Sequence, residues 1–493
     1  MGYEAKLIRT FSHAEPQKLG FGVLLVACLM ISIAYTSFTK PFEFPFSSIS
    51  SRLSAHINPV FGVTLSSRVL DEGSEKDINV TVQNSGNQYQ TMSSTPENIT
   101  AIITSNSNQS DAIINCNVAD QRSAFCEMNG DIRILGSSSS LVIFDSSKRN
   151  RTWRIRPYAR KQDNVAMDGV REVTLKTSAD HRELPHCEII HTSPAIVFSV
   201  GGYTGNFFHD FTDVLVPLFL TSHQFNGEVH FLVTNMRSWW INKYRPIFKR
   251  LSKYQVIDFD TDDKVQCFSK AIVGLRSHKE LSIDSSRSPN HYSMLDFTKF
   301  MRNTYSLERE TPTKYLGKHN GKKPRLLIIS RKRTRRFTNI SKITSMAEKL
   351  GFEVVVAEAN SSTNMKDFAC MVNSCDVMMG VHGAGLTNLV FLPTNAIFIQ
   401  VVPWGSLDWI TTNYFKEPAM DMKLRYLEYR ISEEESTLME VYPRDHPVFK
   451  DPLSIHKHGW NAIKEMFLDK QNVKLNLRRF RAVLVKALLL LRH

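Results

Sequence analysis

The sequence predicts an α/β protein with two domains of alternating strands and helices, preceded by an N-terminal transmembrane helix and a stem. Three observations support this expectation. Short apolar runs alternate with helical patterns from about residue 151 onward, which is typical of parallel doubly wound sheets. The polar segment 314–324 divides this alternation into two blocks. An uncharged stretch, 19–38, stands near the start of the 493-residue chain.

The uncharged stretch 19–38 follows a tail of residues 1–18. Twenty residues of helix cross a bilayer core of about 30 Å, whereas a cleavable signal has an apolar core of about 7–15 residues and a small-residue cleavage site. We therefore expect a retained anchor. More basic residues precede the span than follow it: Lys6, Arg9 and Lys18 against Lys40 and Arg52. This asymmetry predicts a cytosolic N-terminus and a lumenal body.

Residues 39–110 are rich in Ser, Thr and Asn and predict a lumenal stem. Sequons for N-glycosylation occur at Asn79, Asn98, Asn108, Asn150, Asn339 and Asn360. We expect Asn339 to cap a helix and to carry no glycan, because a glycan there would crowd the basic segment described below. Glycosylation of the other sequons requires a secretory lumen, which agrees with the predicted anchor.

Seven cysteines are present, and Cys28 lies in the predicted anchor. The remaining six form an even set that permits three disulfides. The candidate pairs are Cys116–Cys126, Cys187–Cys267 and Cys370–Cys375. Buried free thiols are the alternative for any one of these pairs.

The two blocks predict Rossmann-like domains at 111–315 and 316–493. In the first block, strands are expected at 195–200, 227–235 and 253–260, with helices at 206–223, 239–252 and 294–305. In the second block, strands are expected at 324–330, 351–358, 376–382 and 396–403, with helices at 339–350, 365–375 and 385–393 and a last helix after Val473. Ligands in such sheets bind at the carboxyl ends of the strands, so residues there are the candidate site.

The first candidate is the turn after strand 376–382. His382 ends the strand, and Gly383, Ala384 and Gly385 lead into a short helix. Glycine permits positive φ and a close approach of the backbone to a ligand. A helix N-terminus offers unpaired N–H groups to an anion or a sugar hydroxyl. A plain tight turn is the alternative, but the position at a strand end favours a binding site.

The second candidate is the basic segment 329–339, "ISRKRTRRFTN", which follows another strand. Arginine binds phosphate bidentately and keeps its charge. The segment therefore predicts a site for the diphosphate of a nucleotide sugar. Arg331 and Arg336 are the best candidates and Arg333 and Arg335 weaker ones, while a solvated basic face is the alternative.

The third candidate is the helix that follows the turn "GGYTGN" at 201–206. His209 and Asp213 are four residues apart and could touch, and Asp210 lies beside them. A sugar acceptor hydroxyl needs a base within hydrogen-bond reach, which predicts Asp210 or His209 as that base. The alternative is that these carboxylates only stabilise the start of the helix.

An acidic turn offers a competing interpretation. Asp258, Asp260 and Asp262 follow a strand and form Asp-x-Asp patterns that could hold Mn²⁺ or Mg²⁺ on the phosphates of a nucleotide sugar. Metal and arginine are alternative ways to stabilise one leaving group. We favour the arginines and expect no metal and no cofactor other than the sugar donor. The net charge of +13 is dispersed, and no nucleic-acid partner is expected.

These stretches together resemble glycosyltransferase family 61 of plants. The matching segments are 205–219, 329–339 and 376–393, together with "WRIRPYARK" at 153–161 and the segment around Cys116 and Cys126. The resemblance runs from about residue 116 to near the end. The segment "EPQKLGFG" before the anchor is similar to the grass xylan arabinosyltransferase branch.

The resemblance implies a type II Golgi membrane protein of GT-B architecture that is inverting and independent of metal. It implies transfer of arabinofuranose or xylose from UDP-arabinofuranose or UDP-xylose to a xylan acceptor, with arabinofuranose favoured. We expect the domain 111–315 to hold the acceptor and the domain 316–493 to hold the nucleotide sugar. A homodimer or a complex with other Golgi transferases is compatible with it. A non-catalytic Golgi scaffold of a xylan synthase complex and a metal-dependent Asp-x-Asp transferase remain the alternatives.

Overall fold

The computed structural model describes residues 112–147, 150–317, 321–358 and 363–492. The predicted tail, anchor and stem lie outside these ranges, as do the sequons at Asn79, Asn98, Asn108 and Asn360. Within the described ranges, no helix combines the length and apolarity needed to cross a membrane. The remaining predicted glycan site, Asn150, is described and exposed.

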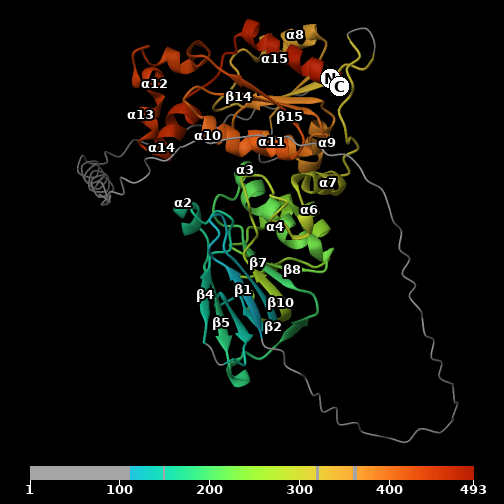
Figure 1. Ribbon diagram of the computed structural model, residues 1–493, viewed down its shortest axis with the longest axis vertical. Helices are drawn as coiled ribbons and strands as arrows, with labels where there is room; N and C mark the ends of the chain where they lie inside the picture. Colours follow the sequence, from blue (N-terminus) through green and yellow to red (C-terminus); the bar gives the residue numbers. More distant parts are fainter. Residues whose placement is uncertain (1–111, 148–149, 318–320, 359–362, 493) are drawn as a thin grey trace, which may run out of the picture. The chain divides into compact units, whose positions relative to one another are not determined.

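The described residues form two sheets, here called the N-sheet and the C-sheet (Figure 1). The N-sheet contains β1 (Ile113–Asn117), β2 (Phe125–Leu135), β3 (Ser140–Phe144), β4 (Thr152–Ile155), β5 (Val173–Ser178), β6 (Ile189–His191), β7 (Ala195–Ser199), β8 (His230–Thr234), β9 (Ile257–Asp258) and β10 (Val265–Val273). The C-sheet contains β11 (Arg325–Ile329), β12 (Glu353–Ala357), β13 (Val377–Val381), β14 (Ile397–Val402) and β15 (Arg425–Arg430). Residues 112–305, which contain the N-sheet, are called the N-lobe. Residues 325–492, which contain the C-sheet, are called the C-lobe.

The C-sheet confirms the predicted parallel sheet of the second block. Its order is β12-β11-β13-β14-β15, and every neighbouring pair is parallel. The side chains of a strand point alternately to the two faces. In β11, Leu326 and Ile328 pack on one face, against α8 (Ile340–Leu350) and α15 (Leu477–Leu490), while Leu327 and Ile329 face the other core. Both faces are covered, as a parallel sheet requires.

The N-sheet is only partly parallel, which corrects the prediction for the first block. Its order is β4-β5-β3-β2-β10-β7-β8-β9; β10, β7, β8 and β9 are parallel, but β2 pairs antiparallel with both β3 and β10. The connection 136–139 between β2 and β3 is too short for a parallel crossover, which needs a dozen or more residues. The predicted strands do not include β10, the central strand that joins the two parts.

The other helical segments connect and cover the strands. In the N-lobe they are α2 (Asn164–Asp168), η1 (His181–Glu183), α3 (Phe207–His209), η2 (Asp210–Leu215), α4 (Val216–Ser222), η3 (His223–Phe225), α5 (Ser238–Lys243), α6 (Arg245–Leu251), η4 (Pro289–His291) and α7 (Met294–Tyr305). In the C-lobe they are α9 (Met365–Asn373), η5 (Ala384–Phe391), α10 (Asp408–Thr411), η6 (Thr412–Lys416), α11 (Glu417–Asp421), η7 (Glu433–Glu435), η8 (Thr437–Glu440), α12 (Pro447–Lys450), α13 (Pro452–His456), α14 (Trp460–Ile463) and η9 (Lys464–Asp469). The predicted helix 206–223 has a π-helical middle, η2, and the predicted helix 239–252 is divided into α5 and α6.

One hydrophobic core is shared by the two lobes. The ring of Phe211 in η2 lies 6.2 Å from that of Phe391 in η5, and the ring of Phe208 in α3 lies 5.6 Å from that of Phe415 in η6. The Ser282 hydroxyl of the N-lobe also donates to the Asp421 carboxylate of the C-lobe. The hydrophobic stabilisation is roughly proportional to the apolar area removed from water, so this shared core holds the two sheets together.

Two of the three predicted cysteine pairs form disulfides, Cys116–Cys126 and Cys187–Cys267. The third predicted pair is wrong, because Cys370 and Cys375 are free thiols. Cys370 lies within α9 and is exposed, whereas Cys375 lies just after the helix and is buried. Residues five apart do not share a face of a helix, so the two thiols point in different directions.

Candidate functional site

The turn 201–206 carries the chain from β7 into α3 at the carboxyl end of the strand. Gly202 has φ +53°, and a Cβ there would lie 2.6 Å from the Tyr158 ring, so only glycine fits. The Asn206 side chain caps the new helix by accepting from the Phe208 amide at 3.1 Å. The turn and this cap thus fix the position of α3 and of His209, its last residue.

His209 forms the predicted pair with Asp213. Its Nδ1 lies 2.9 Å from the Asp213 Oδ2, and its ring, tilted by 46°, lies 4.5 Å from that of Tyr203. Asp213 is fully buried, whereas the His209 side chain keeps 17% of its surface exposed. A carboxylate at Nδ1 favours the tautomer that leaves Nε2 able to take a proton. The geometry is therefore that of a general base held in place by a buried acid.

Asp213 stays ionised because two arginines surround it. Arg160 Nε lies 2.9 Å from Oδ2 and Arg122 Nη2 lies 3.2 Å from Oδ1, while the Tyr158 hydroxyl donates at 2.9 Å. Burial alone would raise the pKa of Asp213, but Arg160, His209 and Arg122 lower it to about 2. The same two arginines bind Glu280 and lower the pKa of that carboxyl against its burial. The network balances its own charges.

Asp210 occupies a different environment from the one predicted. Its carboxylate is fully buried and accepts hydrogen bonds from the Gly205 amide, the Trp240 indole and the Tyr244 hydroxyl at 2.9, 2.8 and 2.7 Å. Lys243 Nζ lies 3.6 Å away. A carboxylate so occupied and shielded from solvent is poorly placed to reach an acceptor hydroxyl, so the geometry favours a structural role for Asp210 and makes His209 the better candidate for the base.

On the C-lobe, the predicted turn and basic segment meet at the ends of β11 and β13. Gly383 has φ +146°, and a Cβ there would lie 2.8 Å from the Nη1 atoms of both Arg331 and Arg335. The Arg335 Nη1 donates to the His382 carbonyl at 3.0 Å, and the Arg331 Nε donates to the Thr334 carbonyl at 2.9 Å. Glycine is thus required to let the two guanidinium groups lie against the backbone of the turn.

These two arginines form no close ion pair with any residue that the structure describes, and Glu358 and Asp469 act on them only from a distance. No carboxylate among the residues that the structure describes lies within 4 Å of either guanidinium, although both are largely buried. Burial and the neighbouring Arg331 lower the pKa of Arg335 to about 9, and the buried Arg335 Nε has no hydrogen-bond partner in the same part of the chain. A partly buried cationic pair of this kind is a candidate site for an anion such as a diphosphate.

Arg336, a leading candidate in the sequence, lies elsewhere. It is exposed, and its backbone joins residues 472–473: its amide donates to the Asn472 side chain and its carbonyl accepts from the Val473 amide. The backbone of Arg335 has φ +56°, in the left-handed region. The Arg335 and Arg336 side chains therefore have different surroundings. The nearby Asn339 precedes α8 as expected, but its side chain bonds the backbone of Leu475 instead of capping the helix.

His382 is neutral. Burial, reinforced by Arg335 and Arg331, lowers its pKa to about 3. Gln400 Nε2 donates to Nδ1 at 2.9 Å, and Tyr426 in turn donates to the Gln400 oxygen. This chain fixes the tautomer with a hydrogen on Nε2, so His382 can donate a hydrogen bond but carries no charge.

A cavity of about 730 Å³, called the strand-end cavity, opens beside these groups. Its polar and charged lining includes residues 330–334, Lys243, Glu358 and Asn388. Its apolar lining includes Phe207, Trp239, Met365 and Phe368. An apolar wall with a few placed polar groups suits a base or sugar attached to an anion.

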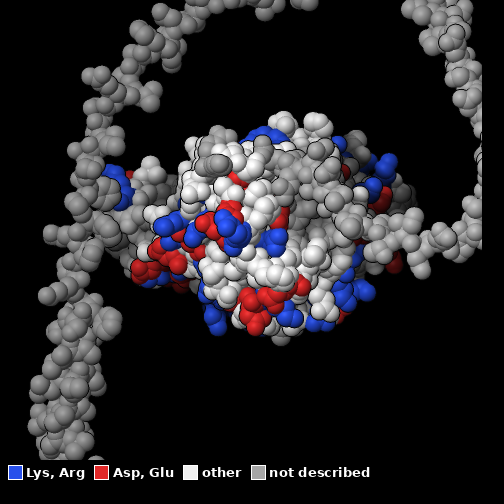
Figure 2. Space-filling model, turned by 90° about the horizontal axis from the view of Figure 1, so that it is seen from below, with Lys and Arg blue, Asp and Glu red and all other residues white. Residues whose placement is uncertain are grey.

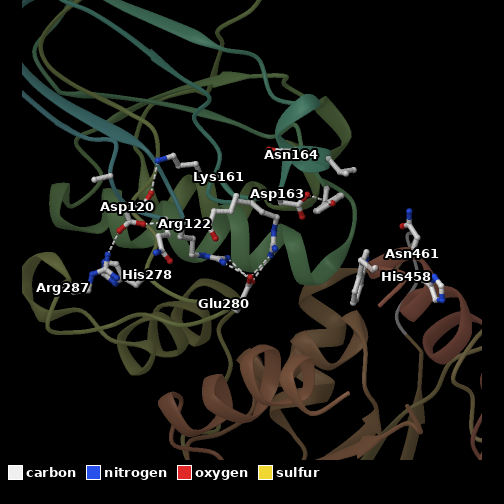
Figure 3. A pocket seen from close by; sticks show the side chains of 18 residues that line it. Asp120, Arg122, Lys161, Asp163, Asn164, His278, Glu280, Arg287, His458 and Asn461 are labelled. Carbon is white, nitrogen blue, oxygen red and sulfur yellow. Dashed lines mark hydrogen bonds and ion pairs between the residues drawn. The ribbon is translucent and has the colours of Figure 1, made fainter. Parts of the chain in front are cut away.

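A second cavity of about 980 Å³, called the interlobe cavity, is lined by residues of both lobes (Figure 3). Arg122 and Glu280 face it from the N-lobe, and His458 and Asn461 face it from the C-lobe. Tyr203, whose ring contacts His209, also lines it. The cavity therefore reaches the neighbourhood of the His209 base.

One tyrosine joins the two candidate sites. The Tyr414 ring is stacked on Phe208 at 4.8 Å and lies 6.5 Å from the His382 ring. Phe208 immediately precedes His209, and His382 begins the glycine turn. Tyr414 thus lies between the segment of His209 in the N-lobe and the His382 strand end in the C-lobe, and nothing in the sequence pattern pointed to Tyr414.

The acidic turn is engaged in structural contacts. Asp260 accepts from the Thr234 hydroxyl and the Asn235 amide, both at 2.7 Å, and Arg171 lies 3.3 Å away. Asp262 accepts from the Gln266 side chain at 2.9 Å. In the described ranges, no group of three or more His, Cys, Asp or Glu side chains is arranged to hold a metal ion.

On the face shown in Figure 2, acidic and basic side chains are interspersed.

Several residues of the site were missed in the sequence. Arg122 and Glu280 come from the loops before β2 and after β10, and Arg160 comes from the loop after β4. Arg160 lies in "WRIRPYARK", a segment that carried the family resemblance without a role. Their partners are tens of residues away, so no local spacing could identify them.

The fold and the site define an α/β protein whose candidate site residues gather at the carboxyl ends of parallel strands, where such folds bind their ligands. The family model of glycosyltransferase 61 matches residues 207–399. Rice (Oryza sativa subsp. japonica) alpha-1,3-arabinosyltransferase XAT2 is 54% identical over 76% of this chain and 64% of its own length. Rice beta-1,2-xylosyltransferase XYXT1 is 48% identical over 77% of this chain and 84% of its own. Arabidopsis thaliana xylan glycosyltransferase MUCI21 is 36% identical over 77% and 80%.

The chain belongs to the glycosyltransferase 61 family. It spans slightly less than two thirds of the length of the arabinosyltransferases XAT2 and XAT3, to which it is 54% and 53% identical. The predicted family is therefore confirmed, and the matched region contains both His209 and the His382–Gly385 turn.

Proposed function

We propose that this protein is an inverting glycosyltransferase that transfers a pentose, arabinofuranose or xylose, from a UDP-sugar to xylan. The observation that carries the proposal is the meeting of a His–Asp base with an unpaired arginine pair through Tyr414. The names of similar proteins supply the sugar and the acceptor: arabinosyl, xylosyl and xylan. Arabinofuranose is favoured because XAT2 and XAT3 have the highest identities among these relatives.

In the proposed reaction, His209 Nε2 removes the proton of a xylose hydroxyl. The hydroxyl oxygen attacks the anomeric carbon from the face opposite UDP, the bond to the diphosphate oxygen breaks, and configuration inverts. The Asp213 carboxylate stabilises the imidazolium that forms, and Arg160 and Arg122 keep this carboxylate ionised. The step needs no redox partner.

The departing UDP gains negative charge on its diphosphate. Arg331 and Arg335 are positioned to bind this charge, together with the backbone amides after Gly383. The neutral His382 ring donates a hydrogen bond from Nε2. The apolar side chains that line the strand-end cavity receive the nucleoside. The interlobe cavity receives xylan. Both lobes therefore contribute to the acceptor site, whereas the sequence led us to expect the N-terminal domain alone.

The proposal includes a GT-B architecture and a type II orientation in the Golgi membrane, with the body in the lumen. The two disulfides and the sequence of the predicted anchor support a secretory location. A measurement on intact microsomes checks this: protease should spare the body until detergent is added.

The deciding experiment is a transfer assay with the full-length protein purified in detergent. UDP-arabinofuranose and UDP-xylose are offered separately with xylo-oligosaccharides, and products are identified by mass and linkage. We expect one added pentose per product, with inverted configuration and full activity in EDTA. Loss of activity in EDTA would favour the Asp-x-Asp alternative, and absence of any transfer would favour the scaffold alternative.

A further inference from the structure

Two exposed tryptophans stand together on the C-lobe. Trp409 in α10 and Trp460 in α14 each keep 44% of their surface exposed, whereas Trp240 is fully buried. Their ring centroids lie 6.1 Å apart, with the planes at 72°. Exposed indole pairs are unusual because each forgoes the burial of a large apolar surface.

The helices that carry the pair are anchored to each other. Leu407, Ile410, Ile463 and Phe467 belong to a buried cluster that joins the α10 region to α14 and η9. The His456 ring nitrogen Nε2 lies 2.7 Å from the Gly405 carbonyl and ties α13 to the loop before α10. The backbone positions of the two tryptophans are therefore fixed before a ligand binds, which lowers the entropy cost of binding.

The pair lies at one end of a row of aromatic rings that leads to the proposed base. Trp460 lines the interlobe cavity, and Trp409 contacts Tyr414 at 6.3 Å. Tyr414 is stacked on Phe208, the residue before His209. A ligand that lies across Trp460 is thus in the same cavity as Tyr203, whose ring contacts that of His209.

We propose that Trp409 and Trp460 form a stacking platform for xylose rings of the xylan chain that lie away from the reacting hydroxyl. This inference rests on the proposed function and deepens it. A pyranose ring presents C–H groups on its faces, and the negative face of an indole attracts them. The charged lining of the interlobe cavity is largely paired with itself, as in Asp120 with Arg287 at 2.5 Å and Glu280 with two arginines, which suits a neutral acceptor.

The test measures binding of xylohexaose and xylotriose to the full-length protein by calorimetry. Trp409→Ala and Trp460→Ala should each weaken xylohexaose binding about fivefold, by the loss of one aromatic contact. The preference for xylohexaose over xylotriose should shrink in the double variant. Trp409→Phe and Trp460→Phe should restore most of the affinity, which a merely structural role would not require.

Leu453→Ala is the matched control, because Leu453 is an exposed apolar residue of α13 that does not line either cavity. Unchanged xylohexaose affinity in the double tryptophan variant would overturn the platform while leaving the proposed function in place. A wild-type protein that binds no xylo-oligosaccharide would overturn it as well. If the wild type binds xylohexaose through the tryptophans but transfers no pentose, the platform stands and the proposed function falls.

Discussion

Two aspartates three residues apart in one helix have different partners. Asp210 is enclosed by Trp240, Tyr244 and the Gly205 amide, whereas Asp213 is enclosed by arginines and holds His209. The π-helical turn of η2 contains both. A π-bulge rotates the side chains that follow it, and such bulges are frequent at functional sites. The two carboxylates therefore predict different mutant phenotypes.

The first prediction concerns the base. His209→Gln should lower kcat by about 10²–10⁴-fold, because a general base contributes about that much. The thermal midpoint should change little, since the side chain is partly exposed. Steady-state kinetics at saturating donor and acceptor check this, and a kcat near that of the wild type would remove His209 from the mechanism.

The second prediction concerns its neighbour. Asp210→Asn should destabilise the protein by about 2–4 kcal/mol, because it weakens three buried hydrogen bonds to a charged acceptor. Its folded fraction should keep a normal kcat. Urea unfolding and active-site-normalised kinetics separate the two effects. A stable but inactive Asp210→Asn variant would restore Asp210 as the base.

The third prediction compares two adjacent arginines. Arg335→Ala should weaken UDP binding about 10- to 100-fold, because it removes a charged partner of the diphosphate. Arg336→Ala should leave the UDP affinity unchanged, since its side chain is exposed and its surroundings differ from those of Arg335. Calorimetric titration of both variants with UDP checks this, and the reverse order of effects would contradict the assigned anion site.

At the scale of elements, the turn from β13 into η5 positions the donor site. Gly383 and Gly385 are both glycines of this turn, but their surroundings differ. A Cβ at Gly383 would meet two guanidinium groups at 2.8 Å and needs φ +146°, whereas a Cβ at Gly385 would meet only the Ile329 methyl at 3.1 Å. Gly383 therefore lies against the two arginines of the proposed anion site, while Gly385 lines the strand-end cavity without contacting either guanidinium.

The fourth prediction follows from this difference. Gly383→Ala should displace Arg331 and Arg335 and weaken UDP binding at least about tenfold, with a backbone strain of about 1–3 kcal/mol. Gly385→Ala is the matched control and should affect UDP binding much less. UDP titration and thermal melts of both variants check the prediction, and equal UDP affinities in the two variants would count against it.

At the scale of the whole molecule, the buried network of Asp213 links stability to pH. It ties together Arg122, Arg160 and Glu280, which come from three separate loops of the N-lobe. The pKa of Asp213 is lowered from its ordinary 3.8 to about 2 in the folded protein. A carboxyl whose pKa is depressed by folding stabilises the protein only while it is ionised.

The fifth prediction uses this sign. The contribution of Asp213 should be complete above about pH 4 and should disappear as the pH falls from 4 to 2, with a total of about 2 kcal/mol. The difference in unfolding free energy between the wild type and Asp213→Asn should therefore shrink over this interval. Urea unfolding at pH 6, 4 and 3 measures it, and a difference that is constant with pH would contradict the assignment.

The sequence was informative where the signal is local. The strands and helices of the C-lobe follow short apolar runs and helical periodicity. The parallel orientation of the strands was predicted from the alternation of strands and helices alone. The helix 294–305 was predicted with its observed bounds. The N-sheet was less predictable, because β10 pairs with β2, which lies about 130 residues earlier, and no local pattern records such a pairing.

The same limit applies to the site. The His209–Asp213 pair and the glycine turn follow from spacing, since residues four apart meet on a helix and a strand end exposes its turn. The choice between Arg335 and Arg336, and between Asp210 and Asp213, depends on backbone direction and burial. Those depend on contacts with Gly383, Trp240 and Tyr244 that are distant in the sequence.

By itself, the sequence determined the family, the α/β class, the basic segment and the helix that carries the His209–Asp213 pair, because each depends on periodicity or residue type within a short window. Only the tertiary structure decided which charges are paired, which carboxylate is enclosed and where the two cavities open. The physical reason is that burial and ion pairing are properties of atoms brought together by folding, and the chain order does not specify them.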